Sequence, residues 1–344
     1  MSGSVRGVVR AMVHADGLAW QNLYRRAHLL PAWTRRKRRE IEAEHEARGI
    51  IDEPLPFALN QPTAPFLGTS GVHTEWLAFQ LQVLIEGGGR YDRRVALEAW
   101  RDLAARRADL RLSVGQHAAL ENVAAGIDPP TSGHDNPHYF DDSACFRAVA
   151  LLGADGGSLR GGELQEVVAS DAQISNAFDG IWAAQAFAAA LRGALDGADA
   201  GAAVAHARAG IPEGTWLAIE VDRARTHAAE AASLFDLIRR LAGGPTNHAY
   251  DYGNSAPETL AIALAILEFT GGDLEPGLLA ALALPRTAAS VAPMIGALVG
   301  ALGGALGTAH EHQLEDAPLQ GLALPHLAGT RPLALLAELR TSTS

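Results

Sequence analysis

The 344-residue chain has little charge, few aromatic residues and almost no cysteine. Its one cysteine, Cys145, excludes an internal disulfide framework and is expected to be a buried thiol. The formal net charge of -11 argues against a nucleic-acid partner, because binding a phosphate backbone requires a basic face. Alternating strand patterns, glycine-rich phosphate loops, zinc-ligand spacings and the Gly-x-Ser-x-Gly nucleophile motif are also missing. A disulfide scaffold and the common cofactor-binding motifs are therefore excluded.

The composition that remains favours helices packed closely together. Hydrophobic residues make up 48% of the chain, and alanine, leucine and glycine dominate. The pattern predicts an all-α fold in one compact domain over residues 1–344, with residues 31–71 partly loop or lid and residues 308–344 a C-terminal extension. The expected helices cover residues 5–14, 33–48, 74–86, 93–111, 114–125, 143–152, 162–172, 178–196, 200–209, 215–241, 257–269, 274–306 and 333–340.

Residues 280–307 form the most unusual segment. Gly296, Gly300, Gly304 and Gly307 recur at helical spacing, so that small residues line one face and another backbone can approach closely. The uncharged stretch is long enough for a membrane span, but its small residues dilute its hydrophobicity and no partner span is found. A central buried helix is favoured, no membrane is expected as a partner, and a cytoplasmic location is expected because no apolar leader opens the chain.

Two charged segments each allow two interpretations. Residues 33–48 carry five consecutive basic residues followed by alternating glutamates, which fits a phosphate-attracting patch or, as we favour, a solvated helix with paired charges. His310 and His312 could hold a transition metal. Because residues two apart do not share a helix face, a solvated tail is favoured there.

The segment that contains these four glycines also resembles part of a known protein family. The run GALVGALGG follows Thr287, Ala288, Ala289 and Ser290. This arrangement resembles the last signature of the ADP-ribosylglycohydrolase family, in which an Asp-x-Asp-Thr/Ser motif that binds magnesium precedes the glycine run. Both aspartates of that motif are replaced here.

Other segments resemble the same family over about residues 6–307. Residues 15–23 resemble its G-D-A-L-G/A-W-P-x-E pattern, with Asp16 kept and Leu23 in place of a glutamate that many members use catalytically. Residues 73–76 stand where the family has Thr-Asp-Asp-Thr, and Glu75 is the one acid. Residues 141–147 resemble G-N-G-A-A-M-R. The family's Thr-His element looks like Ser175–Asn176, and its G-Y-x-x-x-T-L-x-x-A element looks like Tyr252 with the helix that begins at Glu258, ETLAIALAIL.

The resemblance implies cleavage of a glycosidic bond at the anomeric carbon of ADP-ribose, which the family performs with two magnesium ions. Magnesium requires several oxygen ligands, and this chain keeps too few. We therefore expect no cofactor and no metal ligands. We expect a hydrolase that cleaves an N-glycosidic bond of a small-molecule ribosyl nucleotide or nucleoside derivative without the family's binuclear magnesium site. The alternative is an inactive pseudoenzyme that binds a nucleotide or a protein partner.

The expected catalytic groups are carboxylates and one imidazole. Glu75, beside the apolar Trp76, would activate water, Asp141 or Asp142 would stabilise positive charge on the ribosyl centre, and His138 would protonate the leaving base. Simpler structural roles stay open, because Glu75 suits the first turn of a helix and Asp142 suits an N-cap. The residues expected to bind the substrate in the same cleft are Asp16, Trp20, Asn22, His73, Trp76, Asn136, Tyr139 and Ser290.

Overall fold

The computed structural model describes residues 3–24, 43, 47, 70–246, 250, 252–284, 286–304 and 317–342. These residues form helices and loops without a strand, and one isolated bridge joins Asp141 to Ser255. The all-α prediction is confirmed. The helices are α1 (Val5–Tyr24), α3 (Val72–Glu86), α4 (Arg93–Ala105), α5 (Val114–Ala124), α6 (Thr131–His134), α7 (Ser143–Leu151), α8 (Gly161–Ala172), α9 (Asp179–Leu195), α10 (Ala200–Ala209), α11 (Trp216–Glu230), α12 (Leu234–Gly243), α13 (Ala256–Thr270), α14 (Leu274–Leu282), α15 (Ala288–Ala301) and α17 (Pro332–Ser342), with short 3-10 turns η2 (Arg107–Asp109), η3 (Ala154–Gly157) and η4 (Pro325–Leu327).

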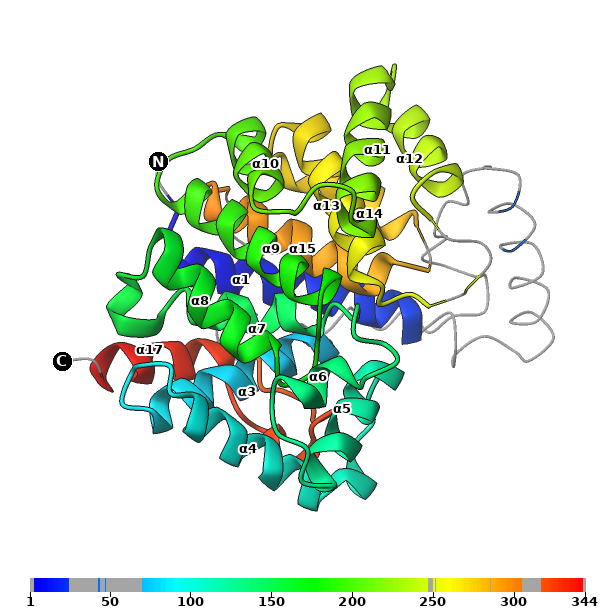
Figure 1. Ribbon diagram of the computed structural model, residues 1–344. Coiled ribbons are helices and arrows are strands. Elements are labelled where there is room, and N and C mark those ends of the chain that lie inside the picture. Colours follow the sequence, from blue (N-terminus) through cyan, green and yellow to red (C-terminus); the bar gives the residue numbers. More distant parts are fainter. Residues whose placement is uncertain are drawn as a thin grey trace, which may run out of the picture.

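Helix α15 lies at the centre and packs along α1 (Figure 1). A Cβ on Gly296 would stand 2.4 Å from the Ala11 carbonyl oxygen, and one on Gly300 would stand 2.5 Å from the Gly7 carbonyl oxygen. Gly296 and Gly300 therefore let the backbones of α15 and α1 approach closely, as the glycine spacing predicted. Every residue of α15 except Ala289 is buried.

Two groups of helices lie on opposite sides of this pair. Helices α10 to α14 lie on one side, and α3, α4 and α17 lie on the other (Figure 1). A second, smaller core forms between α3, α4, α5 and the segment before α17, where Trp76 stacks on Trp100 with ring centroids 5.4 Å apart. No helix of the described segments is both long and apolar enough to cross a membrane.

Several predicted helix boundaries are wrong. The helix expected over residues 215–241 is two helices, because the chain turns to extended backbone at Ala231 and Ser233 then caps α12 through its hydroxyl. The helix expected over residues 274–306 is also two, α14 and α15. Helix α1 runs ten residues beyond the predicted end at residue 14, to Tyr24.

Other expectations fall outside the described residues. These are the charged helix over residues 33–48 apart from two helical positions, the loop up to residue 69, and Gly307, His310 and His312.

Candidate functional site

Asp141 and Asp142 are adjacent buried carboxyl groups at the start of α7. Asn176 fixes this turn, since its side-chain amide donates to the carbonyl oxygens of Tyr139 and Asp141 at 3.1 and 2.6 Å. Asp141 accepts hydrogen bonds from the hydroxyl groups of Ser113 at 2.9 Å and Tyr252 at 2.6 Å, and from the backbone N–H of Ser143 at 2.9 Å. This donor set suits an ionised carboxylate.

Asp142 has a different environment from its neighbour. Its Oδ2 accepts from the Thr259 hydroxyl at 3.0 Å, and its Oδ1 is 3.5 Å from the Asn254 amide nitrogen. Burial, and then the negative charge of Asp141, raise the pKa of Asp142 well above its usual range. A carboxyl group with a raised pKa therefore stands beside one that is held by three donors.

His73 and Ser290 meet the acid pair from two other helices. The Ser290 hydroxyl lies 3.3 Å from His73 Nε2 and 3.4 Å from the Asn254 amide, and it also hydrogen-bonds Asp142. The His73 ring stacks on Phe146 at a centroid distance of 4.0 Å, and its burial lowers its pKa to about 3. The imidazole is therefore neutral. The structure brings together the predicted site residues His73, Asp142 and Ser290. It adds Asn254, which the sequence did not indicate, and Thr259, which lies in the helix from Glu258 that resembles a family element.

Asp16, on α1, is buried against the start of α3. Its Oδ2 accepts from the Thr74 backbone N–H at 2.8 Å and from the Thr74 hydroxyl at 2.7 Å. Burial raises the pKa of Asp16 to about 7, although the bonds from Thr74 oppose this shift. Trp20 follows one turn later on α1 and is half-buried; Asn22 lies in the last turn of α1.

The raised pKa of Asp16 makes the stability of the folded protein depend on pH. A raised pKa means that the folded state holds a proton that the unfolded state releases from about pH 4, so stability is lost as pH rises toward 7. We expect the wild type to lose about 2–3 kcal/mol more than Asp16→Asn between pH 5 and pH 8, because asparagine keeps the acceptor for Thr74 without titrating. Urea unfolding at both pH values measures this difference, and equal losses in the two proteins would refute the assignment.

Glu75 lies in a different environment from the one expected. Its Oε1 accepts from the Leu322 N–H at 2.6 Å, and its Oε2 accepts from the N–H groups of Ala323 and Leu324, both at 2.8 Å. Burial raises its pKa, and these backbone donors oppose that shift. Both oxygens thus hold the C-terminal segment of residues 317–330 against α3. Catalysis by Glu75 stays a prediction, and its contacts favour a structural role.

The position of Trp76 corrects a prediction. Its side chain is completely buried, stacked on Trp100 and edge-on to Phe79. It therefore belongs to the core and forms no ligand-facing wall, because no part of the ring reaches solvent.

A stability measurement tests the role of Glu75. Replacing Glu75 by glutamine removes the charge and turns an amide N–H toward backbone donors, so we expect a loss of about 2–4 kcal/mol in the free energy of unfolding. Amide hydrogens of residues 322–324 should exchange faster. Glu86→Gln, an exposed change on the same helix, is the matched control and should shift stability by less than about 0.5 kcal/mol. Unchanged stability and exchange in the Glu75 variant would contradict this role.

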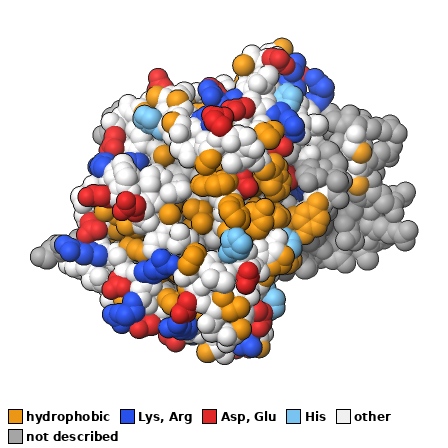
Figure 2. All heavy atoms as spheres, in the orientation of Figure 1, with side chains coloured by type: hydrophobic (Ala, Val, Ile, Leu, Met, Phe, Trp, Pro, Cys, Tyr) orange, Lys and Arg blue, Asp and Glu red, His pale blue; other side chains and the backbone are white. Residues whose placement is uncertain are grey.

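Aromatic side chains gather beside the acid pair. The ring of His138 lies 4.7 Å from that of Tyr252, and its Nε2 hydrogen-bonds the Tyr250 hydroxyl. Tyr139 packs edge-on against Phe140 and Phe178. Figure 2 shows apolar side chains across the middle of this face of the molecule. The sequence pointed to His138 and Tyr139 as site residues and to Tyr252 as part of a family-like element, but not to Phe140, Phe178 or Tyr250.

Phe178 and Asn136 have special positions in this region. Phe178 has a backbone φ of 42°, which is strained for a residue other than glycine, and yet its side chain is 47% exposed. The Asn136 amide nitrogen donates to the carbonyl oxygens of Gly115 and Ser175 at 2.9 and 2.8 Å, and its oxygen accepts from the His138 N–H. Asn136 therefore shapes the loop and has no free group for a substrate.

The residues at the family's metal positions do not fit a binuclear magnesium site. Thr74 is bound to Asp16, Glu75 to backbone N–H groups, and Ser290 to His73 and Asn254. Ala288 and Ala289 offer no oxygen. Within the described segments, no three His, Cys, Asp or Glu side chains converge as metal ligands. Magnesium requires about six oxygen ligands in octahedral geometry, which this set cannot supply.

The comparisons with known proteins identify the class of this helical fold. The sequence model of the ADP-ribosylglycohydrolases matches residues 17–328, so the chain belongs to the ADP-ribosylglycohydrolase family. Family membership supports a glycohydrolase-type hydrolase.

One similar solved structure is described as an "ADP-ribosylglycohydrolase-related protein complex". Its TM-score is 0.55 and its sequence identity is 20%, with 97% of this chain and 99% of that chain covered, so the two share a fold over nearly their whole lengths. No curated protein sequence gives a significant match.

Proposed function

We propose that the protein hydrolyses an N-glycosidic bond of a ribosyl nucleotide or nucleoside derivative, without the family's binuclear magnesium site. The observation that carries the proposal is the pair Asp141 and Asp142, two adjacent carboxyl groups in contrasting environments. One is held by hydroxyl and backbone donors, and the other has a raised pKa. Paired carboxyl groups in contrasting environments provide the acid and the stabilising charge that glycosidic cleavage requires.

The proposed reaction uses the Asp142 carboxyl group twice, first as acid and then as base. Asp142 donates its proton to the leaving nitrogen as the C–N bond breaks, and the charge of Asp141 stabilises the cationic ribosyl centre. Water then forms the new C–O bond at the anomeric carbon, and the Asp142 carboxylate takes the proton that this water loses. The enzyme returns to its starting state, with free base and ribosyl product released.

Asn254 would control access to Asp142. Its side chain is partly exposed, and its two contacts with Asp142 and Ser290, at 3.5 and 3.4 Å, are at the outer limit for hydrogen bonds. Displacement of this amide would therefore open the carboxyl group to a substrate at small cost. The aromatic rings of Tyr139, Phe140 and Phe178 lie on the adjoining surface and would stack on the base.

Other predicted residues take supporting roles in this scheme. His73 and Ser290 hold Asp142 and Asn254 in place. His138, bonded to Tyr250, is positioned to contact the leaving base rather than to replace Asp142 as its acid. Asp16 supports the start of α3, from which His73 projects.

A second function has its own supporting observation. Thr74, Glu75 and Ser290, at the family's metal positions, are bonded within the protein, and Asp141 and Asp142 are at most 1% exposed. A closed polar network of this kind also suits a pseudoenzyme that binds a nucleotide or a protein partner on the aromatic surface.

Release of free base distinguishes the two functions. The wild type is incubated with a panel of nucleotides and nucleosides, products are separated by chromatography, and nucleotide binding is followed by calorimetry. Base release from at least one compound is expected. No base release from any compound of the panel, together with measurable nucleotide binding, would establish the pseudoenzyme.

A further inference from the structure

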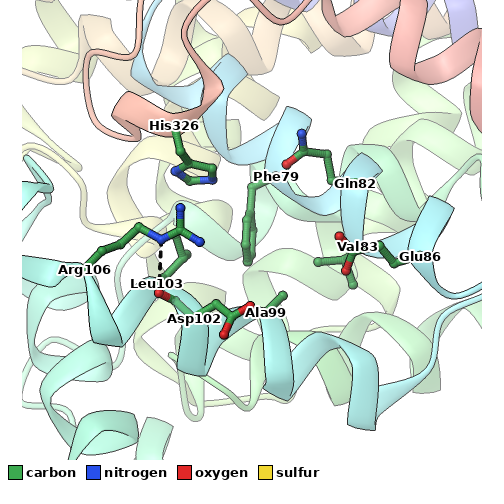
Figure 3. Close-up of a pocket in the computed structure, with 9 residues that line it drawn as sticks. All are labelled: Phe79, Gln82, Val83, Glu86, Ala99, Asp102, Leu103, Arg106 and His326. Atoms are coloured by element: carbon green, nitrogen blue, oxygen red, sulfur yellow. Dashed lines mark hydrogen bonds between the residues drawn. The ribbon is translucent and has the colours of Figure 1, made fainter.

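A pocket unrelated to the acid pair opens between α3, α4 and η4, and Figure 3 shows its lining. Its floor is apolar: Phe79, Val83 and Leu103 are at most 4% exposed to solvent and come from two helices, and Ala99 lies beside them. The cavity measures about 170 Å³. This is smaller than the roughly 300–1,000 Å³ of pockets for drug-sized ligands, so it fits only a small molecule.

The rim of the pocket carries opposite charges on different sides. Arg106 and His326 lie together at one side, Glu86 lies across the Phe79 ring from them, and Asp102 lies along the lower edge (Figure 3). The Arg106 guanidinium is close enough to His326 to lower the pKa of that imidazole, after the larger effect of burial. The cavity is therefore bordered by one cationic group, Arg106, and by the carboxylates of Asp102 and Glu86.

The charged groups on the rim form no ion pair with any residue that the structure describes. The Arg106 guanidinium donates one bond, from Nε to the Asp102 carbonyl oxygen at 3.2 Å, which leaves its terminal nitrogens free. The carboxylates of Glu86 and Asp102 form no ion pair with any described residue. On the same helix α4, by contrast, Arg94 pairs with Glu98 and Arg101 pairs with Asp128. Charged groups without an ion pair to a described residue therefore stand around this pocket.

We propose that this pocket binds a small zwitterion with an apolar body, of the size of an aliphatic α-amino acid. Its carboxylate would lie against Arg106 and His326, its ammonium group against Glu86 or Asp102, and its side chain on the Phe79, Val83 and Leu103 floor. Charge-assisted hydrogen bonds at both ends would fix the orientation, and the floor would supply the apolar contact.

The pocket is also linked to the C-terminal segment. His326 belongs to η4, which directly follows the backbone N–H groups held by Glu75. A ligand that joins His326 to α3 and α4 would therefore hold residues 317–330 more firmly against the body of the protein. Binding should slow amide exchange at Leu324 and Leu327.

Calorimetry on the full chain tests the proposal, with L-leucine, L-methionine and L-phenylalanine as probes. We expect at least one to bind, and its N-acetyl and amide derivatives, which each lack one charge, to bind at least about tenfold more weakly. Ala99→Leu, which fills the hollow, should abolish binding, and Arg106→Gln should weaken it at least about tenfold. Arg93→Gln, an exposed change on the same helix, is the control and should leave affinity unchanged.

Two results would overturn the proposal. One is that none of the three amino acids binds to the folded wild type. The other is that binding survives in Ala99→Leu or is unaffected by blocking either charge, which would place the ligand elsewhere. Neither result depends on base release, so the pocket and the glycosidase activity stand or fall separately.

Discussion

Asp142→Asn is expected to lower the rate of base release at least about a hundredfold, the lower end of the range for one lost acid–base group. Asparagine cannot donate a proton to the leaving nitrogen or take one from water. The fold should survive, because burial already disfavours the charged form of Asp142 and raises its pKa, and a neutral amide of the same shape replaces it. Thr259 can accept from the new amide while it donates to the Ser255 carbonyl oxygen, 3.1 Å away.

The matched control is Asp135→Asn, an exposed acid in the preceding loop. This variant should keep wild-type turnover. Turnover and the thermal unfolding midpoint are measured for both variants. A folded Asp142 variant with full activity would remove Asp142 from the mechanism while leaving the glycosidase activity in place. Glu75→Gln, by comparison, should reduce activity only as far as it reduces the folded fraction.

Gly296→Val is expected to cost about 3 kcal/mol or more in the free energy of unfolding. The new Cβ would stand 2.4 Å from the Ala11 carbonyl oxygen and 2.7 Å from the Ala15 Cβ. Neither neighbour is a flexible side chain that could turn away. Helices α1 and α15 would have to separate along the centre of the fold, and urea unfolding measures the loss.

Gly201→Ala provides the control for this substitution. Gly201 is exposed in α10, and its nearest neighbour to an added Cβ is 3.6 Å away, in ordinary contact. Stability should be unchanged or raised by up to about 1 kcal/mol, because alanine favours the helix. Equal effects at the two glycines would mean that α1 and α15 do not approach as closely as the structure shows.

Sequence periodicity was sufficient to predict the helical fold and the buried position of α15. It was not sufficient to predict the breaks, because hydrophobic spacing continues across them. The Ser233 cap of α12 is a local signal that could have been read from the sequence, and so is Pro285 between α14 and α15.

The site shows a different limit. His73, Asp142 and Ser290 could be named because they stand at family positions, and the structure brings them together. Asn254 carries no pattern of its own, whereas Thr259 lies in the helix from Glu258 that resembles a family element. The contacts of both residues with Asp142 join segments more than one hundred residues apart. The partners of Glu75 could not be foreseen at all, because they are backbone N–H groups, which every residue but proline possesses.

The most direct test of the account is base release by the wild type in excess chelator, compared with the same assay in added magnesium. The account predicts equal rates for the reactive compound, since Thr287, Ala288 and Ala289 replace the residues of the family's Asp-x-Asp motif. Activity that disappears with the chelator and returns with magnesium would contradict it.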